Sequence, residues 1–165
     1  MPEIVFDSCS ISNFALAGAF GIVTDLYGGR AYITEFVAAE ILRGIQAGHA
    51  RLGAVTEAVR AGRIKRTGLR PGKETRLFES LSLSLGLGEA SSIAAAKMRG
   101  LHFASDDRVA RAEAARSGVL VTGTLGILAA AVRDGVCDLK SADRYLAKMI
   151  EAGFFSPVRT IRGVS

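Results

Sequence analysis

Short apolar runs alternate with longer helical stretches along the chain, and this alternation constrains its fold more than any other feature. The runs end at polar residues, which is typical of buried strands. We expect strands at residues 3–6, 31–34, 101–105 and 119–122, with an edge strand near 63–69. Helices are expected at residues 12–18, 21–27, 35–45, 50–62, 73–81, 88–99, 107–117, 124–135 and 141–153. The alternation predicts an α/β fold with a parallel sheet covered by helices on both faces.

Size and composition predict one domain over residues 1–165. With 49% hydrophobic and 22% charged residues, the chain can bury a globular core. It lacks the ~18 consecutive apolar residues of a membrane helix, and its first residues, MPEIVFD, lack the pattern of a signal peptide. Cys9 and Cys137 lie far apart and show no metal-type spacing. We therefore expect a cytoplasmic protein without a membrane partner.

The net charge of +5 is unevenly distributed. Residues 43–76 contain nine Arg or Lys side chains and two acids, Glu57 and Glu74. Such a basic sector can neutralise phosphates, which makes nucleic acid a possible partner. An arginine-rich solvated surface explains the same pattern, so charge alone leaves both interpretations open.

Two aspartates each follow an expected strand. Asp7 ends the first, and Asp106 ends the strand at 101–105. Ligands of open parallel sheets bind beyond the carboxyl ends, where the strand order reverses, so neighbouring strands would bring these aspartates to one crevice. Glu40 and Glu89 are isolated acids on helical stretches nearby in the expected fold. Carboxylates in one cleft repel each other, and a bound Mg²⁺ or Mn²⁺ ion removes that cost.

Each acid also has a purely structural explanation. Asp7 and Asp106 are suitable helix N-caps, and Glu89 favours the dipole of the helix that it opens. Glu40 can extend to solvent. Asp107 is better suited to opening a helix than to binding a metal. The metal hypothesis therefore rests on the joint pattern of two strand-end aspartates and two helix glutamates.

Two hydroxyl groups are secondary candidates. The Ser8 hydroxyl follows Asp7 and can bond to a metal-bound water. Thr124 follows Gly123 at the start of a helix, where its hydroxyl and the helix amides can meet a phosphate. N-capping explains either residue as well. Arg111 can contact an RNA backbone or pair with helix acids, and the sequence does not decide between these roles.

Five segments together resemble PIN-domain proteins, the fold of the VapC-type toxin ribonucleases, and in particular a subfamily of small prokaryotic PIN proteins. The segments are IVFDSCSISNFA, ITEFVAAEIL, LGLGEASSIAAAK, FASDDRVARAEAARSGVLVTGTLGIL and EAGFF. Their order and spacing carry the resemblance, which covers most of the chain. It implies a three-layer α/β/α sandwich and four acids that hold one or two Mg²⁺ or Mn²⁺ ions.

The resemblance assigns the four acidic positions to Asp7, Glu40, Glu89 and Asp106, with Asp107 as an auxiliary candidate. Many relatives have aspartate where Glu89 stands. The toxins often carry threonine two residues before the fourth acid, where this chain has Ala104. These departures bear on metal affinity and leave the four acids in place.

The function implied by the resemblance is metal-dependent hydrolysis of RNA that leaves 3′-hydroxyl and 5′-phosphate ends. It further implies a toxin role, a small antitoxin partner whose peptide inserts near the acids, and a homodimer. One alternative is a non-catalytic PIN module that binds RNA or a partner protein. A second, an aspartyl-phosphate protein, is less favoured because the first strand ends in Asp-Ser-Cys and so lacks the Asp-x-Asp pair of a phosphatase.

Overall fold

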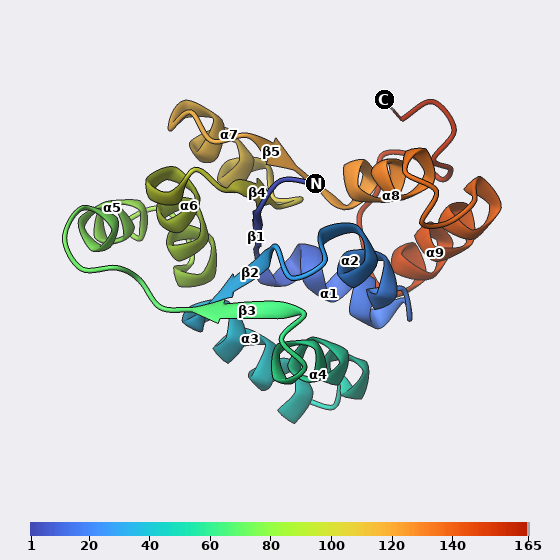
Figure 1. Ribbon diagram of the computed structural model, residues 1–165, viewed down its shortest axis with the longest axis horizontal. Coiled ribbons are helices and arrows are strands. Elements are labelled where there is room, and N and C mark those ends of the chain that lie inside the picture. Colours follow the sequence, from blue (N-terminus) through green and yellow to red (C-terminus); the bar gives the residue numbers. More distant parts are fainter. Residues whose placement is uncertain (165) are drawn as a thin grey trace.

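A computed structural model describes residues 1–164 and contains a five-stranded parallel sheet (Figure 1). The strands are β1 (Ile4–Phe6), β2 (Ala31–Thr34), β3 (Ile64–Thr67), β4 (His102–Ala104) and β5 (Val121–Thr122). Their spatial order is β3-β2-β1-β4-β5, and all neighbouring pairs are parallel. The predicted parallel α/β fold is therefore confirmed.

The helices pack on both faces of this sheet, as in a three-layer α/β/α sandwich. They are α1 (Ser8–Leu16), α2 (Phe20–Tyr27), α3 (Glu35–Gln46), the short 3₁₀ turn η1 (Ala50–Leu52), α4 (Gly53–Arg60), α5 (Lys73–Leu81), α6 (Leu87–Arg99), α7 (Arg108–Arg116), α8 (Thr124–Arg133) and α9 (Leu139–Glu151). Among residues 1–164, no single helix is long and apolar enough to cross a membrane, although α1 and α2 together, bent by 118°, reach that length and composition.

Alternate residues of each strand face opposite layers, which divides the core in two. Ile4 and Phe6 of β1 pack with the buried residues of α1, α2, α4, α8 and α9. Val5, between them, packs with Phe103 of β4 and with residues of α5, α6 and α7. Both faces of β1 are thus fully buried, which explains why its sequence is a continuous apolar run.

The sequence expectation differs from the structure in the segment after α3. Residues 50–62 were expected to form one helix, whereas the chain forms the turn η1 and then α4. The Leu52 side chain packs against Gly44 so closely that a Cβ there would lie 2.5 Å from it. The contact holds η1 against α3, and α4 follows directly from η1. A glycine-to-leucine contact of this kind is not visible in helical periodicity.

The position of β1 creates the cleft of interest. From β1 the chain adds β2 and β3 on one side and then returns to add β4 and β5 on the other. The strand order therefore reverses between β1 and β4, which pair with Phe6 opposite Ala104. The carboxyl ends of these two strands define the crevice at which open parallel sheets bind ligands.

Candidate metal centre

Asp7 lies at the carboxyl end of β1 and is 2% exposed. It caps α1, because its carboxylate accepts hydrogen bonds from the Ser10 amide at 2.8 Å and the Ser10 hydroxyl at 2.7 Å. Burial raises the pKa of Asp7, although hydrogen bonds from Ser105 and Ser10 oppose the rise, and the charge of Asp106 raises it further. The structural and functional interpretations of Asp7 are thus compatible: it caps a helix and presents a charge that the fold compensates only in part.

Asp106 follows β4, and Thr124, the first residue of α8, holds its carboxylate. Its carboxylate accepts hydrogen bonds from the Thr124 amide at 2.9 Å, the Thr124 hydroxyl at 2.5 Å and the Asn13 amide at 3.2 Å. Gly123 makes this approach possible, because a Cβ there would lie 2.6 Å from the Asp106 carboxylate. Asp106 does not cap a helix; the neighbouring Asp107 caps α7 by accepting from the Ala110 amide at 2.8 Å. The two adjacent acids therefore have separate roles.

Glu40 projects from α3 toward the first turn of α6. The Ser8 hydroxyl donates to its carboxylate at 2.5 Å. A Cβ at Gly88 would collide with the same carboxylate, so in this arrangement Glu40 packs directly against the backbone of α6. Glu40 is therefore held between two helices instead of extending freely into solvent.

Glu89 opens α6 and is half-buried. Its carboxylate accepts a hydrogen bond from the Gly86 amide at 3.3 Å, as a first-turn glutamate is expected to do. Burial raises the pKa of Glu89, and the negative charges of Asp107, Asp7 and Glu40 add to the rise. These contributions show that Glu89 shares its electrostatic environment with other acids of the predicted set.

The charges of all four predicted acids affect the pKa of Cys9, at the start of α1. Burial raises the pKa of its thiol to about 11, and the charges of Asp7, Glu89, Glu40 and Asp106 each contribute. A cleft of about 540 Å³ opens beside it. The lining includes Ser8, Cys9, Ser12, Asn13, Leu16, Glu40, Gly44, Leu52, Asp106, Asp107, Phe154 and Phe155. Of the predicted acids, Glu40, Asp106 and Asp107 line this hollow, whereas Asp7 and Glu89 lie outside its lining.

The acids do not form a ready-made ligand cluster. Within residues 1–164, no three Asp, Glu, His or Cys side chains are close enough together to hold one ion. Glu40 turns toward Ser8, Asp106 toward Thr124 and Asp7 toward Ser10. Each of these carboxylates therefore accepts a hydrogen bond from a nearby hydroxyl group.

The chemistry of the site nevertheless fits a hard divalent cation. Its side chains offer carboxylate oxygens, which are the ligands that Mg²⁺ and Mn²⁺ prefer. The raised pKa values of Asp7 and Glu89 indicate negative charge that the fold leaves uncompensated. Glu40 and Asp106, whose carboxylates accept hydrogen bonds from the hydroxyls of Ser8 and Thr124, both line the cleft of about 540 Å³.

Two side chains near the acids have roles that the sequence does not predict: Asn13 was no candidate, and Arg111 was expected only to contact RNA or to pair with helix acids. Asn13 donates to the hydroxyl of Thr124 at 3.0 Å as well as to Asp106. Arg111 donates to the carbonyl oxygens of Ser105 at 2.7 Å and Thr122 at 3.0 Å, and so ties the ends of β4 and β5 together. The role of Asn13 depends on how α1 meets α8, and no local pattern in the sequence reports that.

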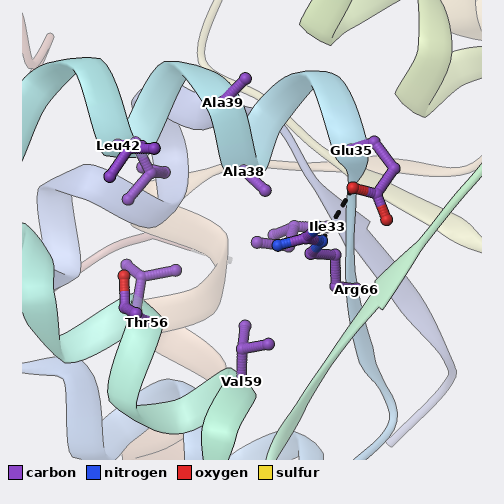
Figure 2. A pocket seen from close by; sticks show the side chains of 10 residues that line it. Ile33, Glu35, Ala38, Ala39, Leu42, Thr56, Val59 and Arg66 are labelled. Atoms are coloured by element: carbon purple, nitrogen blue, oxygen red, sulfur yellow. Dashed lines mark ion pairs between the residues drawn. The ribbon is translucent and has the colours of Figure 1, made fainter.

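A second hollow, between α3, α4 and β3, has a different character (Figure 2). It measures about 290 Å³ and is lined mainly by apolar side chains such as Leu42 and Val59. Its charged residues, Glu35 and Arg66, pair with each other at 2.8 Å. This groove holds no uncompensated carboxylates, so we place the candidate metal centre at the ends of β1 and β4.

Fold and site define a parallel α/β protein with an acidic cleft at its topological switch point. Comparison with known families specifies the class: the model of the family DUF3368, a PIN domain, matches residues 3–164. The chain belongs to the PIN-domain family, a family of nuclease type. No curated protein matches the chain.

Proposed function

We propose that this protein is a divalent-metal-dependent endoribonuclease that hydrolyses RNA phosphodiester bonds. The observation that carries the proposal is the parallel pairing of β1 with β4, which brings Asp7 and Asp106 to one crevice. Glu40 and Glu89 lie in the same region, since burial and then the charges of Asp7, Glu89 and Glu40 raise the pKa of the neighbouring Cys9 thiol. Membership of the PIN-domain family supports a nuclease with this arrangement.

In this proposal Asp7, Glu40, Glu89 and Asp106 hold Mg²⁺ or Mn²⁺, and Asp107 assists from the exposed rim. When bound, such an ion lowers the pKa of a water molecule and neutralises charge that develops on the phosphate. Ser8 orients Glu40, while Thr124 and Asn13 orient Asp106. The products carry 3′-hydroxyl and 5′-phosphate ends.

The charge distribution suits a polyanionic substrate. The net charge is +5, so removing the four acids leaves +9 (5 + 4) on the rest of the chain. The exposed Arg51 donates to the Leu16 carbonyl at 3.0 Å, and Leu16 lines the acidic cleft. A basic side chain is therefore fixed at one edge of the hollow, where it can neutralise a phosphate of bound RNA.

The proposal is tested with Asp7→Asn and the matched control Asp138→Asn. Both aspartates cap helices through backbone amides, at Ser10 and Ser141, and asparagine preserves a cap. We expect labelled RNA with Mg²⁺ or Mn²⁺ to be cleaved by wild type and by Asp138→Asn. Asp7→Asn should lose at least about 100-fold in rate while still binding RNA. Binding without cleavage by wild type would instead identify a non-catalytic PIN module.

We further propose that the protein is the toxin of a toxin–antitoxin pair, that it acts as a homodimer, and that it resides in the reducing cytoplasm. Both cysteines are free, which agrees with a reducing compartment. The cleft of about 540 Å³ has room for side chains of an inserted antitoxin peptide. Growth arrest on expression tests the toxin role, and sedimentation of the purified chain tests the dimer.

A further inference from the structure

Phe155 is an aromatic side chain left in solvent beside the acidic cleft. Its exposed fraction is 96%, the highest among the exposed large apolar residues of the described chain. The backbone before it is well anchored. Gly153 ends α9 with φ +113°, and the Phe154 amide donates to the Met149 carbonyl at 2.9 Å. Phe154 packs on the core, so Phe155 is displayed from a fixed turn.

The turn lies between two hollows. Phe154 and Phe155 line the acidic cleft, and they also line a neighbouring hollow of about 450 Å³. Asp106 borders both hollows, and Arg111 borders the second. A chain that passes from one hollow to the other therefore crosses Phe155 next to a predicted metal ligand.

The turn at Phe154 and Phe155 forms a ridge between the two hollows, and the chemistry of this ridge suits an unpaired nucleotide. An exposed aromatic ring offers a face on which any base can stack, whereas the bases of a duplex are already stacked on each other. Arg111 uses one guanidinium nitrogen to hold Ser105 and Thr122, and its side chain lines the second hollow, where its charge can attract a phosphate. The ridge thus combines a stacking surface, a cation and a carboxylate of the candidate centre.

We propose that Phe155 is a residue that positions the RNA strand, because its ring stacks on a base next to the scissile phosphate. The inference rests on the proposed nuclease function and adds a binding residue outside the predicted acids. Phe155 is then a binding residue, which holds the strand across the two hollows so that the phosphate faces Asp106.

The chain contains no tryptophan, which permits a direct test. In Phe155→Trp the new indole is the sole tryptophan fluorophore, and a base that stacks on it quenches its emission. We expect quenching by single-stranded RNA and little by a duplex of the same sequence. The control is Leu83→Trp, because Leu83 is 89% exposed and lies between α5 and α6. Its emission should not change.

Affinity provides a second measurement. Phe155→Ala should bind a single-stranded oligonucleotide about tenfold more weakly, and Phe155→Tyr should restore binding, because stacking needs only an aromatic ring. KM should rise with little change in kcat. Anisotropy in the Asp7→Asn background measures binding without cleavage.

The outcomes separate the two proposals. Quenching with no cleavage by wild type would refute the nuclease and leave the stacking site standing. Absent quenching together with unchanged affinity of Phe155→Ala would overturn the stacking site even in an active nuclease. A Phe155→Ala variant that binds RNA normally but loses self-association would overturn it as well, and would assign the ring to a contact with a second copy.

Discussion

Glu74 and Asp7 are both almost completely buried carboxylates, with exposed fractions of 3% and 2%. Arg99 meets Glu74 through two hydrogen bonds, of 2.9 and 2.7 Å, and the Arg70 amide donates a third at 2.6 Å. Burial raises the pKa of Glu74, but the hydrogen bonds and charge of Arg99 outweigh it, so the net pKa is lowered. At Asp7 burial prevails and the pKa is raised.

Glu74 differs from Asp7 in having a cationic partner. Arg99 also donates to Thr67 at 2.8 Å and to the Gly68 carbonyl at 2.8 Å, so its pair with Glu74 fastens the loop after β3. Within residues 1–164, none of the four acids of the candidate centre forms an ion pair. A buried charge that the protein does not compensate is costly to keep. In the proposed function, a bound divalent cation supplies the missing counter-charge.

The largest expected effect is on stability at Glu74. Glu74→Gln leaves the Arg99 guanidinium without its counter-charge, and we expect a loss of about 3–5 kcal/mol in the free energy of unfolding. Asp7→Asn removes an uncompensated charge and should be neutral or stabilising in metal-free buffer. Urea unfolding measures both. Glu57→Gln breaks the exposed pair with Arg60 and should cost less than about 1 kcal/mol. Equal losses at Glu74 and Glu57 would contradict the comparison.

Stabilisation by a divalent cation should come next in size. An ion that binds only the folded state at 100 times its Kd adds about 2.7 kcal/mol to stability. We expect Mg²⁺ or Mn²⁺ to raise the Tm of wild type relative to EDTA. The shift should disappear in Asp7→Asn and persist in Asp138→Asn, because Asp138 caps α9 and does not follow β1 or β4. An equal shift in all three proteins would place the ion elsewhere.

The sequence predicts the strand-end acids well and their supports poorly. Asp7 and Asp106 could be placed together because strand ends meet at a topological switch point, and the pairing of β1 with β4 confirms this neighbourhood. Asp107 was correctly expected to open a helix. These predictions succeed because each depends on local pattern and on a general rule of sheet topology.

Interactions between distant elements were beyond sequence reasoning. The pair of Glu74 with Arg99 joins residues 25 positions apart, and Glu74 had been counted only as one of two acids in a basic sector. Thr124 was expected to meet a phosphate or cap a helix, whereas its amide and hydroxyl both donate to Asp106. Such partners follow from how α6 meets the β3 loop and how α8 meets β4, which composition and periodicity do not encode.

Thr124 supports a smaller prediction. Thr124→Val removes the hydroxyl that donates to Asp106 but preserves the shape of the side chain, and the backbone donor remains. We expect cleavage to fall about tenfold, the lower end for residues that orient metal ligands. The apparent metal affinity should fall with it, and Thr124→Ser should restore both. If Thr124→Val lowers kcat without changing the metal dependence of cleavage, the Thr124 hydroxyl acts on the substrate and not through Asp106.

The smallest expected effect is on the pH dependence of stability, to which Asp7 and Glu74 should contribute with opposite signs. An acid whose pKa is raised on folding binds more protons in the folded state, so stability falls as pH rises from the ordinary value, 3.8 for Asp7, to the raised one. For Glu74 the pKa is lowered, so its stabilisation is complete above 4.5 and is lost as pH falls through the folded value.

Each single group contributes a slope of at most about 1.4 kcal/mol per pH unit. In chelator-containing buffer, the stability of wild type relative to Asp7→Asn should therefore decline as pH rises above 3.8. Relative to Glu74→Gln it should increase toward 4.5. Slopes of the same sign would mean that Asp7, like Glu74, is compensated within the fold, and the reason to assign a cation to the cleft would disappear.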